Sequence, residues 1–282
     1  MTTTATRMTG HTPTMLDYDF MRKAFAAATV VAIVSGAVGY FLVLRGQTFA
    51  GHALSHVGFT GATGAFLVGL SPLWGLVLLT VAAGIAMGMM GERLAQRDVA
   101  IGMVLSLSLG FGLLFLHFYT ASATQATALL FGNVLAVNLG TVWTLLALGV
   151  ASLAALAVIS RPLLFASLQP ELAEAKGISL RRYSVFFLAI VALATAECAQ
   201  IVGVLLVFTL MVGPAASAQR LTTGVIRGVL LSAGLALAEA WLGITLAFYT
   251  DWPTSFWISA LSAAAYLLTA LPRPVARARL IQ

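Results

Sequence analysis

Residues 99–118 read VAIGMVLSLSLGFGLLFLHF, twenty consecutive residues without Asp, Glu, Lys or Arg. A helix of roughly 20 apolar residues spans the hydrocarbon core of a bilayer. The strands of a membrane β-barrel are shorter and alternate between apolar and polar residues, which this stretch does not do. The segment therefore predicts a transmembrane helix and an all-α fold class.

Composition extends this prediction to the whole chain. The 282 residues are 60% hydrophobic and 9% charged, whereas a soluble domain has roughly 25% charged residues. We expect a polytopic membrane protein of eight or nine transmembrane helices, with a polar N-terminal segment at 1–23, a transmembrane domain at 24–271 and a basic tail at 272–282. The other apolar segments lie at 24–44, 52–70, 73–91, 141–160, 184–218, 225–248 and 254–271.

The segment 184–218 is too long for one span and short for two. It also carries Glu197 and Gln200 near its middle. Breaks in membrane helices occur where protein or a wet cavity surrounds the free backbone groups. We therefore expect two short spans here, with the helix broken near residue 197.

The net charge of +6 lies mainly in short loops between the apolar segments. Basic loops are typical of the cytoplasmic side of a membrane protein, so this charge predicts orientation and not nucleic-acid binding. Cytoplasmic loops and a cytoplasmic C-terminus follow, and the aromatic residues of the opposite loops suit the outer interface. The basic residues are Arg93, Arg97, Arg161, Lys176, Arg181, Arg182, Arg220, Arg227, Arg273, Arg277 and Arg279; the aromatic ones are Tyr119, Trp143, Tyr249, Trp252 and Trp257.

Two histidines lie four residues apart in GHALSH, residues 51–56. On a helix, His52 and His56 share one face, and two imidazoles so placed can hold one divalent metal ion. The same spacing also suits two polar residues that face a packed interior. The pair lacks the glutamate of an HExxH motif, which argues against an intramembrane zinc hydrolase.

Three carboxylates complete the candidate site. Glu197 and Glu239 lie within apolar segments, and Asp251 precedes the last one in a predicted turn. A charged group at membrane depth costs at least about 2.5 kcal/mol, so each buried carboxylate should face a partner, water or an ion. A hydrogen bond between packed helices would also satisfy them. Imidazole and carboxylate together suit zinc, manganese or ferrous iron, so these residues and the histidine pair predict a pathway for a divalent cation.

Six segments, in order along the chain, resemble the membrane permeases of bacterial zinc/manganese ABC importers. The resemblance covers about residues 20–271. The segments are LRGQTFAGHALSHVGFTGATGAF (44–66), ERLAQRDVAIGMVLSLSLGFGLLFL (92–116), LLFGNVLAV (129–137), LQPELAEAKGISLRRY (168–183), VGVLLVFTLMVGPAASAQRL (202–221) and DWPTS (251–255).

The resemblance implies a multi-pass permease of the bacterial inner membrane that moves a divalent metal ion inward by alternating access. It implies a homodimer, two cytoplasmic ATP-binding subunits and an extracytoplasmic metal-binding protein as partners. The chain has no GxxxxGK[ST] phosphate loop, so ATP hydrolysis is expected in a separate subunit and the chain itself is not an enzyme. The metal is cargo, and no tightly bound cofactor is expected.

The resemblance also assigns roles to particular residues. The segment 161–183 would be a cytoplasmic coupling segment, in which Glu171, Glu174 and Lys176 are solvated and Gly177 ends a short helix. Residues 168–180 of this segment would contact the ATP-binding subunits.

The family's metal ligands map onto His52 and His56, but His52 stands where the family usually has Asp. A neutral imidazole at that position favours zinc over manganese, and Glu197 could supply the missing charge. Two alternatives stay open. The first is a manganese or iron ABC permease, and the second is an ion-coupled secondary transporter in which Glu197 and Glu239 are proton or sodium relays.

Overall fold

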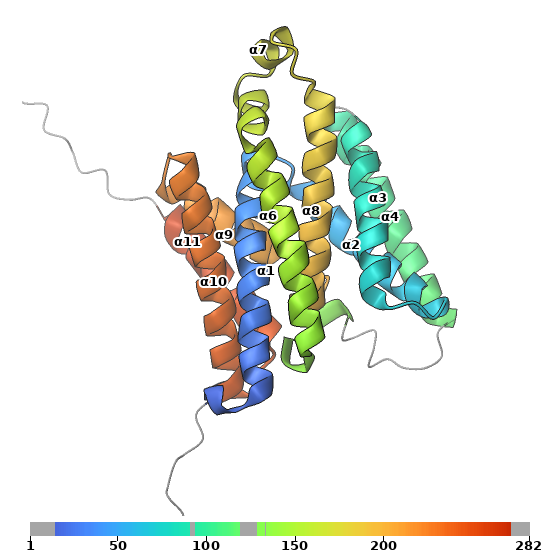
Figure 1. Ribbon diagram of the computed structural model, residues 1–282, viewed down its shortest axis with the longest axis vertical. Helices are drawn as coiled ribbons and strands as arrows, with labels where there is room; N and C mark the ends of the chain where they lie inside the picture. The colour runs from blue at the N-terminus through green and yellow to red at the C-terminus, as the bar shows by residue number, and fades with distance from the viewer. Residues whose placement is uncertain (1–14, 91–93, 119–128, 133, 272–282) are drawn as a thin grey trace, which may run out of the picture.

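The computed structural model describes residues 15–90, 94–118, 129–132 and 134–271 (Figure 1). Within these ranges every regular element is a helix, which confirms the predicted all-α class. The helices are α1 (Asp19–Leu44), α2 (Thr48–Leu67), α3 (Pro72–Met89), α4 (Leu94–Phe118), α6 (Leu139–Leu168), α7 (Pro170–Ala175), α8 (Leu180–Val202), α9 (Val207–Leu221), α10 (Val225–Thr250) and α11 (Thr254–Ala270), with single 3-10 turns η1 (Met15–Asp17) and η2 (Val134–Ala136).

In the described part of the chain, six helices are long and apolar enough to cross a membrane: α1, α3, α4 over Asp98–Phe118, α6, α8 and α10. The other helices fall short by this measure. The helices α9 and α11 have 15 and 17 residues, and α2 carries the histidine pair and several hydroxyl side chains. The predicted count of eight or nine spans is therefore not confirmed.

The predicted break near residue 197 is wrong. Helix α8 runs without interruption through Glu197 to Val202, and the chain turns at Gly203 before α9 begins. The Ser152 hydroxyl of α6 donates a 2.8 Å hydrogen bond to Glu197 Oε1, so the carboxylate is accommodated without opening the helix. The segment 184–218 does form two helices, as expected.

Two glycines meet at the joint between α8 and α9. Gly203 has φ +80° and Gly132 has φ +75°, a region that side chains rarely adopt. A Cβ on Gly203 would lie 2.2 Å from the Gly132 nitrogen. The backbone N–H groups of Val204 and Leu205 donate to the carbonyls of Leu129 and Leu130, at 3.1 and 3.2 Å. This contact of 129–132 with 203–205, here called the glycine crossing, satisfies the backbone groups that the helix break releases.

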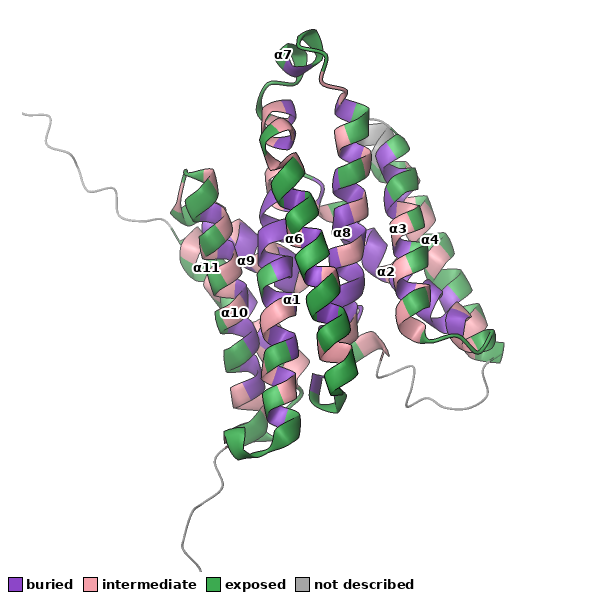
Figure 2. Cartoon of the chain, viewed as in Figure 1, coloured by how far each residue is buried: buried purple, intermediate pink, exposed green. Residues whose placement is uncertain are grey.

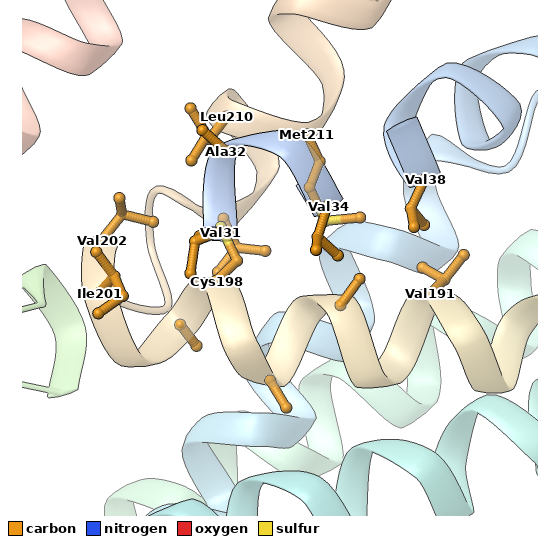
Figure 3. Close-up of a cluster of buried hydrophobic side chains, with 14 of the residues drawn as sticks. Val31, Ala32, Val34, Val38, Val191, Cys198, Ile201, Val202, Leu210 and Met211 are labelled. Atoms are coloured by element: carbon orange, nitrogen blue, oxygen red, sulfur yellow. The ribbon is translucent and has the colours of Figure 1, made fainter. Parts of the chain in front are cut away.

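Helix α1 lies at the centre of the bundle. It packs against α10, α9, α6 and α8, and its residues are mostly buried, whereas α6 and α10 expose their outward faces (Figure 2). Valines of α1 face Val191 and Cys198 of α8 and Met211 of α9 (Figure 3). Gly36 allows close contact, since a Cβ there would lie 2.6 Å from the Ala233 Cα of α10. Small residues that let helix backbones approach are typical of membrane bundles.

Most of the described basic residues lie at one end of the bundle. The C-terminal ends of α1, α6 and α9 and the N-terminal ends of α8 and α10 lie at one end of the bundle, where α7 also projects (Figure 1). This basic end carries Arg45, Arg161, Lys176, Arg181, Arg182, Arg220 and Arg227, and the opposite end carries Trp143, Tyr249, Trp252 and Trp257. Arg22 and Lys23 near the start of α1 also lie at this opposite end, where both pair with Asp19. Arg93, Tyr119, the tail at 272–282 and most of the polar segment at 1–23 lie outside the described residues, as does the side chain of Arg97.

Candidate functional site

The two histidines lie side by side on α2, with ring centroids 4.9 Å apart. Both are half-buried, and Nδ1 of His56 is buried without a hydrogen-bond partner in the described residues. Ser55 donates a 2.7 Å hydrogen bond to the His52 carbonyl, and the Thr60 hydroxyl, which lies 3.3 Å from the His56 carbonyl, donates its shorter hydrogen bond to the Ser108 carbonyl of α4. Nδ1 of His56 is thus available to a ligand.

Phe208 covers one side of the pair. Its ring centroid lies 5.4 Å from that of His52, in an edge-on arrangement. Phe208 stands in the first turn of α9, directly after the glycine crossing, so the crossing sets where this ring lies. Sequence reasoning missed Phe208, because one phenylalanine among 16 carries no signal of its own.

Glu197 faces another part of the bundle. It is fully buried at the α6–α8 contact. Ser152 of α6 donates to Oε1, whereas Oε2 has no hydrogen-bond partner in the described residues. Gly149, one turn before Ser152, lets α6 approach α1 beside the carboxylate, since a Cβ there would lie 2.9 Å from Val30 Cγ1 and 3.0 Å from Val34 Cγ2. The structure thus pairs Glu197 with α6.

The other two predicted ligands are also apart from the histidines. Glu239 is buried on α10; its oxygens make no well-formed hydrogen bond in the described residues, although the Ser262 hydroxyl of α11 lies beside them. Asp251 is exposed and ends α10 with φ +57°. It lies in the turn before α11, next to Trp252, whose ring stacks on Trp257.

The structure therefore brings together His52 and His56 but not the three carboxylates. Among the described residues, no group of three or more His, Cys, Asp or Glu side chains could hold a metal ion. Protein zinc sites use three or four ligands, so the pair alone is an incomplete site. Two half-buried imidazoles can hold a divalent ion weakly and leave open the positions that further ligands would fill.

The predicted coupling segment forms a small knob beyond the bundle (Figure 1). Helix α7 is held by an apolar cluster in which Ala173 packs with Ala166 and Leu180, next to Phe165 and Ile178. Lys176 Nζ lies 5.5 Å from the Phe165 ring centroid, an arrangement suited to a cation–π contact. Glu171, Glu174 and Lys176 are exposed, and Gly177 follows the helix with φ +80°.

Arg45 connects this knob to the histidine helix. It lies in the turn between α1 and α2, and its Nη1 donates a 2.7 Å hydrogen bond to Ser167 in the last turn of α6. Its guanidinium carbon also lies 5.5 Å from the Phe187 ring centroid of α8. The end of α6 that leads into α7 is thus tied to the beginning of α2.

Known proteins resemble the chain over most of its length. The manganese transport system membrane protein MntC of Listeria innocua is 29% identical over 83% of this chain and 84% of its own length. The manganese import system permease protein ScaB of Streptococcus parasanguinis is 28% identical over 92% of this chain and 93% of its own.

Solved structures also resemble the chain over most of its length. One described as PsaBC from Streptococcus pneumoniae in complex with Fab matches with a TM-score of 0.82 and 27% identity, over 92% of this chain and 94% of the other. An inward-facing structure of a putative metal-chelate type ABC transporter shares the fold, with a TM-score of 0.67 and 17% identity. The model of the ABC 3 transport family matches residues 17–272, so the chain belongs to that family.

Proposed function

We propose that the chain is the membrane-spanning permease subunit of an ATP-driven importer for a divalent metal ion. The observation that carries this proposal is the His52–His56 pair, half-buried on α2 with a 4.9 Å centroid separation and with Nδ1 of His56 buried without a hydrogen-bond partner in the described residues. Membership of an ABC transport family supports it, as do relatives named for manganese transport. ATP hydrolysis then belongs to a partner subunit.

Two metals compete in this proposal. Two neutral imidazoles, with no carboxylate beside them, favour zinc by ligand preference. The names of the relatives favour manganese. Transport needs only weak binding, because the site must also release the ion, and this requirement fits both metals.

A second copy of the chain would complete the metal site. The histidines and Phe208 lie where the described protomer is open, since His52 and His56 are half-buried and Phe208 is exposed. A twofold axis near this surface would bring an equivalent pair from the second copy. The ligands that one protomer lacks would then come from its partner, and the ion would pass between the two copies.

We place the basic end in the cytoplasm and count nine spans. Helix α2 packs against α3, α4 and α8, helix α9 against α1 and α10, and helix α11 against α10 and α9. This packing supports their crossing the membrane with the spanning helices. An N-terminus outside would put Arg22 and Lys23 there, but both pair with Asp19, which reduces their charge. The C-terminal end of α11 and the α7 knob then lie on the cytoplasmic side, and a metal-binding protein would dock at the aromatic end.

The proposed mechanism is alternating access. The ATP-binding subunits would bind the α7 knob. Its apolar cluster joins α7 to the end of α6 and the beginning of α8, so a movement of the knob would also move these helices. Movement of α6 would pass through the Arg45–Ser167 contact to α2 and thus to the histidines. Phe208, at the start of α9, would open or close one side of the pair.

A secondary transporter is the second candidate. The observation in its favour is that Glu197 and Glu239 are buried with oxygens that lack a full set of hydrogen bonds in the described residues, as proton relays often are. Deleting the gene for the partner ATPase separates the two candidates. Uptake that continues would support the secondary transporter, and uptake that stops would exclude it.

The test of the site is metal uptake into proteoliposomes that hold the assembled importer, with zinc and manganese in competition and metal content measured by mass spectrometry. The variant is His52→Ala/His56→Ala. His117→Ala is the matched control, because His117 is exposed at the end of α4. We expect uptake to collapse in the double variant and to continue in the control. Unchanged uptake with intact assembly would make the pair a packing feature and refute the proposed site.

A further inference from the structure

A groove of about 830 Å³ lies between α1, α6 and α10 at the basic end of the bundle. Its lining is largely apolar: Ala37 and Phe41 come from α1, Leu156 from α6 and Leu230 from α10. The volume lies within the range of about 300–1,000 Å³ that is typical of ligand sites. Figure 2 shows exposed residues along α6 and α10, two of the helices that line the groove. None of the lining residues belongs to α2, which carries the histidine pair.

The mouth of the groove is positively charged. Arg161 of α6 and Arg227 of α10 line it, both are exposed, and none of the lining residues is acidic. Neither arginine takes part in an ion pair among the described residues. Helix α10 begins here without a side-chain cap, so its dipole adds partial positive charge at the same place. Guanidinium groups match phosphate oxygens in geometry as well as in charge.

We propose that this groove binds one anionic phospholipid of the surrounding bilayer, with an acyl chain along the apolar lining and the phosphate held by Arg161 and Arg227. A soluble anion would meet the arginines but not the long apolar body, and an uncharged lipid would leave the two cations without a counter-charge. Basic pockets between transmembrane helices on the cytoplasmic side are known to bind anionic headgroups. Assigning the lipid to the inner leaflet rests on the proposed orientation, whereas the binding itself does not.

The test is native mass spectrometry of the full-length permease, titrated with palmitoyl-oleoyl-phosphatidylglycerol or with phosphatidylcholine that has the same chains. We expect phosphatidylglycerol to bind about tenfold more tightly than phosphatidylcholine, because its anionic headgroup can form charge-assisted hydrogen bonds. The variant Arg161→Gln/Arg227→Gln should lose this preference. Lys176→Gln/Arg181→Gln removes the same charge at the same end but outside the groove, and it should keep the preference.

A second variant tests the apolar body of the groove. Ala157 lines the groove and Ala155 does not, although both are exposed on α6. Ala157→Phe should fill the groove and reduce phosphatidylglycerol binding about tenfold, while Ala155→Phe should bind as the wild type does.

Three results would overturn the proposal. One is equal binding of the two lipids to the wild type, and another is unchanged binding in both groove variants. The third is a permease dimer that retains no lipid and dissociates in the Ala157→Phe variant, which would show that a second copy of the chain covers the groove.

Discussion

Substituting alanine for Gly203 tests whether the glycine crossing holds the joint between α8 and α9. Gly203 has φ +80° and ψ 158°, a conformation almost restricted to glycine, and forcing another residue into it costs about 1–3 kcal/mol. The new Cβ would also lie 2.2 Å from the Gly132 nitrogen, and relief of such overpacking costs about 1–3 kcal/mol more. We expect a total loss of about 4 kcal/mol, which lowers the melting temperature by about 8–16 °C.

Gly46 is the matched control. Its φ is +63°, but no atom lies within 4 Å of a Cβ built there. Gly46→Ala should therefore cost only about 1 kcal/mol, a shift of about 2–4 °C. The assay is thermal denaturation of the purified full-length permease, followed by size-exclusion fluorescence.

A third variant examines the partner glycine. A Cβ on Gly132 would lie 2.3 Å from the Ile201 carbonyl oxygen, so Gly132→Ala should destabilise the permease about as much as Gly203→Ala. The double variant should cost less than the sum of the two, because both disrupt one contact. If Gly203→Ala melts within a few degrees of Gly46→Ala, the crossing is not tightly packed and the reasoning fails.

Three further predictions follow from the buried carboxylate, the histidines and the knob. Ser152→Ala leaves Glu197 Oε1 without its hydrogen-bond partner and should destabilise the permease by about 1–3 kcal/mol. The control in the same melting assay is Ser160→Ala, which removes only a hydrogen bond to the Ala157 carbonyl of the same helix. Equal shifts in melting temperature for the two variants would contradict the prediction. Metal uptake should fall between pH 7.5 and about 5.5, because protonated imidazole cannot bind metal; a flat profile would count against the histidine pair. Charge reversal in Glu171→Lys/Glu174→Lys should reduce co-purification of the ATP-binding subunit severalfold, and undiminished co-purification would place that contact elsewhere.

Most of the helices were predictable because their apolar segments are long and carry no charged residue in the interior; the segments 184–218, with Glu197, and 225–248, with Glu239, are the exceptions. The basic end was predictable as well. Successive loops between spanning helices lie on alternate sides of the membrane, and the basic residues fall mainly in every second loop. The position of the break was not predictable. Glu197 indicated a break because it is a charged residue in an apolar run, but its partner Ser152 lies far away in the sequence and becomes visible only when α6 and α8 pack. The glycine at residue 203, which does turn the chain, was one of 26 glycines.

The candidate site was predictable only in its local part. The i, i+4 spacing places His52 and His56 on one face of any helix, and the structure has them adjacent. Whether Glu197, Glu239 or Asp251 joins them depends on how four helices pack, and sequence spacing carries no such information. Phe208 approaches His52 through the path of α9 after the crossing, a geometry set by backbone contacts and not by any motif.

The central position of α1 has a consequence for how the protein is made. It is the first of these helices to leave the ribosome, yet its main neighbours α6, α8, α9 and α10 begin at residues 139, 180, 207 and 225. Helices insert into a bilayer individually before they associate. Helix α1 therefore stays surrounded by lipid until most of the chain has been synthesised. A chain that stops before α10 would leave the Gly36 face of α1 without its partner. Such a fragment would leave that surface of α1 exposed to lipid, and the bundle can close only after α10 has been synthesised.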